Sequence, residues 1–399
     1  MQHLIAAARQ AMEFYPDSTI VSADDTFAAL DCFCRRRAVE RIAVFTGTGS
    51  VERAGHWSVF LNALATLNPA LQRFGGIPAE PDTENVAAMT GFLRDTRPDL
   101  VIAFGGGSVM DAAKAALIVT ETGLPLEECF GASRIAALRP GRKFRRIVAV
   151  PTTSGTGSEV TPYSNIVNRA RGVKQLISDP ALIPELALLR ADFTASMPES
   201  VTLATGCDAL AHLIEGWLNV GQDGNCPAVN GWAETGAMLI REALPRLNRD
   251  GGDRAARQAM QLAATLGGMT IRFKSTGLPH LASFSWFGRI PHGIAVARLL
   301  PEAWRFYLGN PAVAERTMAI ARVFPGKTPA EVIASYEQFL DACRVPRLGD
   351  YPELDEELMR LTARSAGSNR MKLELAPRPV TPEESEEVLS AMLERAFER

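Results

Sequence analysis

The stretch from Thr205 to Trp217 constrains the fold of this chain more than any other. Asp208 and His212 are four residues apart, so in a helix they lie one above the other on the same face. The surrounding positions are almost wholly apolar, and a helix that is apolar on all sides is buried. Because an unpaired buried charge costs roughly several kcal/mol, this carboxylate and this imidazole need a partner.

Two kinds of partner fit this pair of side chains. The carboxylate and the imidazole can hydrogen-bond to each other, which is a purely structural role. Alternatively, both can bind a divalent metal, since carboxylate oxygen and neutral imidazole nitrogen suit Fe²⁺ or Zn²⁺. The stretch by itself leaves both interpretations open.

The first half of the chain alternates short apolar runs with helical segments. The runs cover residues 41–45, 99–104 and 147–150, and helical patterns start near residue 51 and span about 109–119. This alternation is typical of parallel β/α units. We therefore predict an α/β nucleotide-binding-like domain over residues 1–190.

The second half of the chain reads differently, with long helical periodicity and few β-branched runs. We predict an all-helical domain over residues 191–399, with helices over 201–219, 229–248, 253–271, 292–308, 311–323, 329–343, 354–366 and 381–398.

Composition excludes several classes of protein. The chain has 399 residues, which suggests two domains, and its net charge of −3 gives no electrostatic footprint for nucleic acid. We expect no membrane-spanning helix, because the chain lacks a run of about 18 apolar residues. The six cysteines are scattered, which favours free thiols in a reducing compartment. No signal peptide is recognisable at the N-terminus, and we expect a cytoplasmic protein.

Two motifs in the first half indicate a phosphate-bearing ligand. Gly105, Gly106, Gly107 and Ser108 join a predicted strand to a helix, where backbone N–H groups and the helix N-terminus bind anions. The segment 151–161 carries six hydroxyl side chains and two glycines, more donors than a plain loop needs. A glycine-rich turn without a ligand is the structural alternative for each.

Further motifs follow in order along the chain. They are Lys174 ahead of Asp179-Pro180, Thr205 to His212, Gly268-Met269 through His280, Ile290 to Gly293, and Arg378-Pro379 with Thr381-Pro382. Over about residues 40–399, this set resembles the iron-dependent (group III) alcohol dehydrogenase family. The resemblance implies a Rossmann-like α/β domain followed by a helical domain, the fold shared with dehydroquinate-synthase-like enzymes.

The resemblance also implies a metal site and its chemistry. The family's one Asp and three His fall on Asp208, His212, His280 and His292, and only His3 and His56 remain elsewhere. The implied metal is Fe²⁺, with Zn²⁺ as a substitute. The implied reaction is hydride transfer between a nicotinamide coenzyme and a carbonyl compound or its alcohol, in a homo-oligomer. The implied coenzyme contacts are Gly47, Ser50, Gly105, Gly106, Gly107, Ser108, Asp111, Thr152, Thr153, Thr156, Thr161 and Lys174.

Three departures from the family pattern bear on specificity. Phe284 occupies the position of a histidine that is taken as a proton relay, so the proton must come from water, ribose or a nearby serine. The segment between His280 and His292 is about two residues shorter than usual. Gly47 stands where NAD-preferring members carry Asp, and with Arg53 nearby this favours NADPH, while NADH remains an alternative.

Pro279 to Phe284 resembles the corresponding segment of phosphonoacetaldehyde reductases, a branch of the same family. Lys274, Phe284 and Arg289 are therefore candidate substrate contacts, because a cationic side chain matches an acid group through charge-assisted hydrogen bonds. Arg289 is the strongest of these candidates, and a solvent-facing position is the alternative for Lys274.

These observations predict a metal-dependent NAD(P)H oxidoreductase that interconverts a small aldehyde or ketone, including one with an acid group, and its alcohol. The narrower alternative is phosphonoacetaldehyde reductase or another carbonyl reductase of a biosynthetic pathway. A dehydroquinate-synthase-like lyase is the alternative of another class, and a metal-free binding protein is a third.

Overall fold

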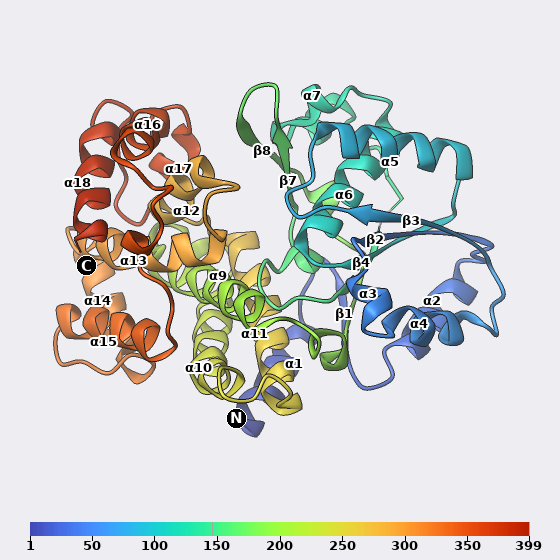
Figure 1. Ribbon diagram of the computed structural model, residues 1–399, viewed down its shortest axis with the longest axis horizontal. Coiled ribbons are helices and arrows are strands. Elements are labelled where there is room, and N and C mark those ends of the chain that lie inside the picture. Colours follow the sequence, from blue (N-terminus) through green and yellow to red (C-terminus); the bar gives the residue numbers. More distant parts are fainter. Residues whose placement is uncertain (146, 399) are drawn as a thin grey trace. The chain divides into compact units, whose positions relative to one another are not determined.

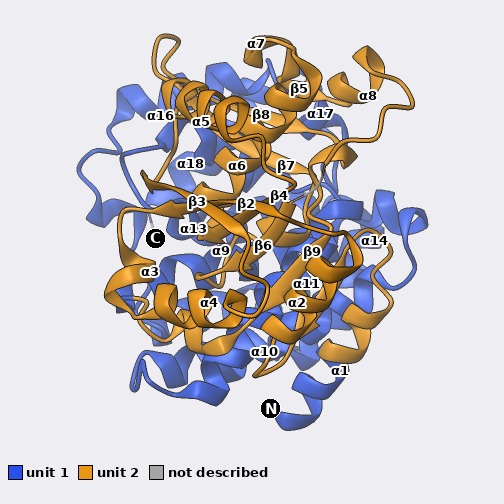
Figure 2. Cartoon of the chain, turned by 90° about the vertical axis from the view of Figure 1, so that its right-hand side faces the viewer, with its two compact units in different colours: residues 1–8, 198–399 blue, residues 9–197 orange. Residues whose placement is uncertain are grey.

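The computed structural model describes residues 1–145 and 147–398, and its contacts divide the chain into two compact units (Figure 2). One unit runs from Arg9 to Met197. The other contains residues 1–8 together with the chain from Pro198 onward. The sequence placed a domain boundary between residues 190 and 191, whereas the contacts divide the chain after Met197.

The α/β unit is built on a six-stranded sheet with the order β1-β9-β6-β4-β2-β3, and every neighbouring pair is parallel. The predicted α/β class is confirmed, and the three predicted strands are β2, β4 and β6. The bounds are β1 (Thr19–Ser22), β2 (Arg41–Gly47), β3 (Ala70–Ile77), β4 (Leu100–Gly105), β6 (Ile147–Pro151) and β9 (Leu186–Leu189).

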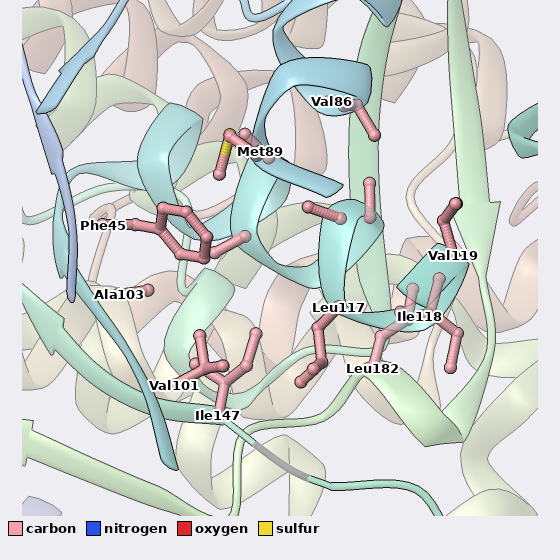
Figure 3. Close-up of a cluster of buried hydrophobic side chains, with 14 of the residues drawn as sticks. Phe45, Val86, Met89, Val101, Ala103, Leu117, Ile118, Val119, Ile147 and Leu182 are labelled. Atoms are coloured by element: carbon pink, nitrogen blue, oxygen red, sulfur yellow. The ribbon is translucent and has the colours of Figure 1, made fainter. Parts of the chain in front are cut away.

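The central strands are apolar on both faces, so helices cover the sheet on each side. Phe45, Val101 and Ala103 point into one core, shown in Figure 3, which α5 (Thr83–Thr96) and α6 (Gly107–Thr122) complete. The alternate positions Val44 and Ile102 point into a second core with α2 (Phe27–Arg36) and α4 (His56–Leu64). The period-2 alternation of a strand thus feeds two separate cores.

A smaller sheet, which the sequence analysis did not predict, joins β5 (Gly131–Ala132), β8 (Val173–Ser178) and β7 (Tyr163–Asn168). Strands β7 and β8 form an antiparallel hairpin. The remaining helices of the first 190 residues are α1 (Gln2–Glu13), α3 (Ser50–Arg53), α7 (Leu126–Cys129) and α8 (Arg134–Leu138).

Every regular element from residue 199 to residue 397 is a helix, as predicted. Helix α9 (Glu199–Leu218) packs against α10, α11 and α13 and is buried from Gly206 to its end (Figure 1). The others are α10 (Val229–Leu247), α11 (Arg254–Phe273), α12 (Leu278–Ser283), α13 (His292–Tyr307), α14 (Pro311–Ala319), α15 (Pro329–Ala342), α16 (Glu356–Ala366), α17 (Arg370–Glu374) and α18 (Ser385–Phe397). Across the described residues, no helix combines the length and apolarity needed to span a bilayer.

Candidate metal and coenzyme sites

Three elements of the helical unit converge on one carboxylate oxygen. Helix α9 presents Asp208 and, one turn later, His212, both buried. The short helix α12 presents the buried His280, and the first residue of α13 is His292. The Nε2 atoms of His212, His280 and His292 lie 3.5, 3.7 and 3.6 Å from Asp208 Oδ1.

The three separations from Asp208 Oδ1 are close to the edge length of a metal-centred tetrahedron, and the ligand atoms of Asp208, His212 and His280 lie within 4.8 Å of one another. Ligand atoms about 2.1 Å from a central ion lie about 3.4 Å from one another. The side chain of His292 remains 35% exposed, whereas those of Asp208 and His212 are 6% and 7% exposed. The cluster therefore has one accessible side, which suits a centre that admits a small ligand.

Gly293 explains how α13 comes so close to α9. A Cβ atom at this position would lie 1.8 Å from the carbonyl oxygen of Ala204 and 2.8 Å from the backbone nitrogen of Asp208. Only glycine permits this approach of the two backbones. The approach brings the preceding residue, His292, within reach of Asp208.

The outer ring nitrogens of two histidines fix which atom faces the cluster. His280 Nδ1 lies 2.5 Å from Glu215 Oε1, so this nitrogen donates and Nε2 keeps its lone pair. Ser283 donates its hydroxyl proton to the carbonyl oxygen of His280, so its oxygen accepts from His292 Nδ1 at 3.2 Å. Both rings therefore turn Nε2 toward Asp208, which is the atom that a metal ion would bind.

Several buried atoms of the cluster lack a hydrogen-bond partner within the described chain, namely Asp208 Oδ1, His280 Nε2 and His212 Nδ1. Burial raises the pKa of the Asp208 carboxyl, but attraction to the three imidazoles outweighs burial and holds the pKa well below its usual range. Burial lowers the pKa of His212 to about 4, so this imidazole is neutral near pH 7. An anionic carboxylate and unprotonated imidazoles are the form that binds a divalent metal.

Glu215 is a functional residue that the sequence analysis did not identify. Its second oxygen accepts the backbone N–H of Gly277 at 2.6 Å, which ties the start of α12 to α9. Glu215 lies seven residues after Asp208, two helical turns along the same buried face. A carboxylate at that spacing in an apolar helix indicates a second buried polar group beside Asp208, and this pattern could have identified Glu215 from the sequence.

The candidate substrate residues lie in three different environments. Lys274 is fully buried, and its ammonium donates to Asp223 at 2.5 Å and to Asn230 at 2.7 Å, in an internal ion pair. Arg289 is exposed in the turn before α13. Phe284 continues α12 and is half-buried, with the ammonium of Lys372 at 5.9 Å from its ring centroid. The structure therefore brings Phe284, but not Lys274, together with an unanticipated cation.

The candidate coenzyme residues gather at the carboxyl ends of β2, β4 and β6, where parallel sheets bind ligands. Gly105 ends β4 and Gly107 begins α6. A Cβ atom on Gly107 would lie 2.6 Å from Thr156, and one on Gly106 would lie 3.1 Å from Thr153. The glycines thus let the hydroxyl-rich loop pack against the N-terminus of α6. Thr152 is also held there, because its backbone N–H donates to the carbonyl of Gly105.

Other predicted coenzyme residues have partners within the chain. Asp111 accepts from the Ser158 hydroxyl at 2.7 Å and from the Asn165 backbone at 2.9 Å, and this contact fixes the loop to β7. Lys174 forms an ion pair with Glu80 at 3.6 Å, and Ser108 Oγ accepts from the backbone of the same Glu80 at 3.3 Å. Thr161 is buried, and its carbonyl accepts from Lys114.

The turn after β2 carries two guanidinium groups. Arg73, on β3, donates to the Thr46 hydroxyl at 2.7 Å, directly before Gly47, and also pairs with Glu52. Arg53 donates to the carbonyl of Thr48 at 3.2 Å, and Ser50 begins the short helix α3 that carries it. Two guanidinium groups therefore lie near the turn that contains Gly47, and that of Arg73 is paired with Glu52.

Comparisons with known proteins agree with this architecture. The family model for iron-containing alcohol dehydrogenase matches residues 17–191, and that for the C-terminal part of the Fe-containing alcohol dehydrogenase family matches residues 202–393. A 1-propanol dehydrogenase of Salmonella typhimurium is 32% identical over 84% of this chain and 90% of its own length. A phosphonoacetaldehyde reductase of Streptomyces viridochromogenes is 32% identical over 82% of this chain and 84% of its own.

A solved structure shows the same fold along nearly the whole chain. The iron-containing alcohol dehydrogenase of Thermococcus thioreducens superposes with a TM-score of 0.84 at 26% sequence identity, over 96% of this chain and 99% of the other. Two consecutive family models thus cover most of the chain, and a relative matches it over most of its own length. The chain therefore belongs to the iron-containing alcohol dehydrogenase family and is an oxidoreductase that interconverts carbonyl compounds and alcohols with a nicotinamide coenzyme.

Proposed function

We propose that Asp208, His212, His280 and His292 together hold one Fe²⁺ ion, with Zn²⁺ as a competing occupant. The observation that carries this proposal is the set of nitrogen-to-oxygen separations of 3.5–3.7 Å around Asp208 Oδ1, an atom that is buried without a hydrogen-bond partner in the described chain. When bound, the ion supplies a Lewis acid that polarises the carbonyl oxygen of the substrate.

The chain's own residues then orient the ligands and shape the site. Glu215 holds the ring of His280, and Ser283 holds the ring of His292 through its Nδ1 atom. Phe284 places an aromatic ring where related enzymes carry a histidine, so it cannot relay a proton. Ser285 faces Ser365 at 3.4 Å, which leaves Ser283 as the serine hydroxyl in contact with a ligand histidine.

The proposed coenzyme site is the edge formed by Gly105, Gly106, Gly107 and Ser108 with Thr152, Thr153 and Thr156, where N–H groups and hydroxyls bind the pyrophosphate. In this arrangement Gly47 and Ser50 would contact the adenosine ribose, and Lys174 and Thr161 are proposed as further coenzyme contacts. Asp111 fixes the loop that forms the site.

The proposed coenzyme preference is NADPH over NADH. Gly47 carries no carboxylate to bind a ribose 2′-hydroxyl, and Arg73 and Arg53 flank the turn, as suits a 2′-phosphate. A Cβ at Gly47 would make only ordinary contacts at 3.6 Å, so Gly47→Asp fits sterically. We expect a higher kcat/KM with NADPH in the natural chain and a reversal in Gly47→Asp. Equal or better efficiency with NADH in the natural chain would contradict the preference.

The proposed substrate is a small aldehyde that carries an acid group. The similarity to a phosphonoacetaldehyde reductase supports it, although a relative of the same identity is named for 1-propanol. The test is NAD(P)H oxidation by anaerobically Fe²⁺-loaded protein against neutral, carboxylated and phosphonylated aldehydes. We expect turnover of at least one acidic aldehyde with a kcat/KM above that of every neutral one. Coenzyme oxidation by neutral aldehydes alone would contradict it.

Two further properties belong to the same proposal. The six cysteines are all unpaired, which supports a cytoplasmic location. A homo-oligomer is expected from the family, and light scattering after size-exclusion chromatography tests it. A single species of 43.1 kDa would contradict it.

A further inference from the structure

Lys372 is a buried cation that none of the mechanism above uses. It lies on the short helix α17, which packs against α12, the helix that carries His280. Its side chain is enclosed, and its ammonium donates to the hydroxyl and to the carbonyl of Thr276. The ring of Phe284 lies 5.9 Å away, within the range of a cation–π contact.

The hydrogen bonding of this ammonium is incomplete. A lysine ammonium has three N–H donors, and Thr276 supplies two acceptors, both uncharged. Over residues 1–145 and 147–398, no carboxylate lies within 4.0 Å of Lys372 Nζ in an ion pair. The nearest candidate, Glu215, already accepts from His280 and Gly277. A buried charge in this state calls for an anionic partner from outside the chain.

The position of the ammonium relates it to the candidate metal centre. Its charge contributes to lowering the pKa of His212 and opposes the rise of the pKa of His280, so both rings lie within its electrostatic range. Burial lowers the pKa of Lys372 to about 8, so the group is still mostly protonated near pH 7. Phe284, which the ammonium faces, lies one helical turn after His280.

The local charges also leave an excess of positive charge. A divalent ion at the candidate centre would be balanced by the carboxylates of Asp208 and Glu215, since the imidazoles are neutral ligands. The ammonium of Lys372 then remains unbalanced. An anionic substrate would neutralise it.

We propose that Lys372 is a specificity-determining residue that binds the acid group of an anionic aldehyde, a carboxylate or a phosphonate, whose carbonyl is reduced at the adjacent centre. This inference rests on the proposed metal site and deepens the proposed substrate class. It replaces Lys274 and Arg289, which the sequence suggested, by a cation next to the ligand histidines. Thr276 and Phe284 position the ammonium, while its remaining donor serves the substrate.

The first test is the ratio of kcat/KM for a carboxylated aldehyde, succinic semialdehyde, to that for neutral butyraldehyde. Both are measured with Fe²⁺-loaded natural chain, Lys372→Met and the control Lys327→Met, which changes an exposed lysine of the same unit. We expect the ratio to fall about tenfold or more in Lys372→Met only, because a charge-assisted hydrogen bond is lost. If the ratio falls by less than about fivefold in Lys372→Met, or falls equally in Lys327→Met, the inference is overturned.

The second test measures binding without turnover. Calorimetric titration with methylphosphonate, an unreactive anion, uses the same Fe²⁺-loaded proteins. We expect Lys372→Met to bind it about tenfold more weakly than the natural chain and Lys327→Met. Equal affinity in all three would mean that the ion alone binds the anion, and the inference would be wrong.

A third measurement separates this inference from the proposed function. If none of the tested aldehydes supports NAD(P)H oxidation by the Fe²⁺-loaded natural chain, the proposed function fails. The methylphosphonate titration still tests the role of Lys372 in that case. If Lys372→Met loses its cooperative thermal transition, Lys372→Gln, which keeps a polar head beside Thr276, takes its place in both tests. The same thresholds then apply.

Discussion

Two buried polar clusters, one in each unit, look alike in sequence and differ in how their atoms are satisfied. In the α/β unit, the three N–H donors of Lys114 are shared among four oxygens at 2.6–3.0 Å, and Asp111 accepts from Ser158 and Asn165. In the helical unit, Asp208 Oδ1 and His280 Nε2 are equally buried and have no such partner in the described chain. Burial of polar groups therefore does not identify a site. Single unsatisfied atoms such as Thr26 Oγ1 also occur elsewhere in the described chain, so the informative feature is that three ring nitrogens converge on the unsatisfied Asp208 Oδ1.

The same contrast recurs between two lysines of the helical unit. The ammonium of Lys274 is neutralised by Asp223, which also binds Arg316 at 2.5 Å, and it serves the fold. The ammonium of Lys372 has only the uncharged oxygens of Thr276. Thr276, the partner of Lys372, follows Lys274 by two residues. The connection between α11 and α12 therefore carries both the neutralised lysine and the residue that binds the lysine without a counter-charge.

The largest effect is expected from a substitution that prevents α13 from approaching α9 and so separates His292 from Asp208. In Gly293→Ala the added Cβ meets backbone atoms of α9 that cannot yield without moving the helix. We expect loss of metal binding and a loss of stability of about 3 kcal/mol or more. Metal analysis and thermal melting measure both, with Gly231→Ala as the control, since nothing lies within 4 Å of a Cβ there. Normal metal content in Gly293→Ala would contradict the role of this glycine.

The cluster around Lys114, whose polar atoms are all hydrogen-bonded within the chain, should lose stability without any loss of metal. Lys114→Met leaves four oxygens without their buried donor, so we expect the free energy of unfolding of the α/β unit to fall by about 2–4 kcal/mol. Metal content should stay that of the natural chain, because the change lies in the other unit. Chemical denaturation and metal analysis check this. If Lys114→Met kept its stability but changed its metal content, the contrast between the two clusters would be wrong.

A smaller effect is expected when a ligand's orienting group is weakened. Glu215→Gln keeps the shape of the side chain but removes the charge that holds His280 Nδ1–H. We expect metal affinity to fall by about 10- to 100-fold, with the fold retained. Competition with a chelator of known affinity measures the change, and Glu331→Gln, which changes an exposed carboxylate on α15, serves as the control. An unchanged affinity would remove Glu215 from the site.

The smallest expected effect is the contribution of Lys114 to the pH dependence of stability. Burial lowers the pKa of Lys114 to about 8 in the folded chain, against about 10.4 in the unfolded chain. Between these values the unfolded state binds more protons, so this group makes stability rise with pH. We expect the melting temperature of the natural chain, relative to that of Lys114→Met, to increase between about pH 8 and 10. A constant difference would show that the ammonium stays charged throughout.

Sequence reasoning reached the parts of the molecule that have local signatures. The helix periodicity of 201–219 and the apolar runs at 41–45 and 99–104 correspond to α9, β2 and β4. The small sheet of β5, β7 and β8 was not predicted, because its strands lack a clear alternation and depend on tertiary contacts. The convergence of three histidines on Asp208 was expected from the family resemblance, and the geometry now supports it.

The partners of the two buried lysines had no local signature. Lys274 lies close in sequence to His280 but faces Asp223, whereas Lys372 lies far along the chain on α17, which packs against the helix that carries His280. Proximity in sequence therefore suggested Lys274, whose ammonium the structure pairs with Asp223. Only the packing of α17 on α12 shows which ammonium lacks a counter-charge.

The central claim is that one divalent ion is held around Asp208. The most direct measurement is the iron content of protein loaded anaerobically with Fe²⁺ and then freed of excess metal, for the natural chain and for Asp208→Asn. Asparagine keeps the size of the side chain and removes its charge. We predict about one iron per natural chain and less than about a tenth in the variant. Equal iron in both proteins, or none in the natural chain, would contradict the account.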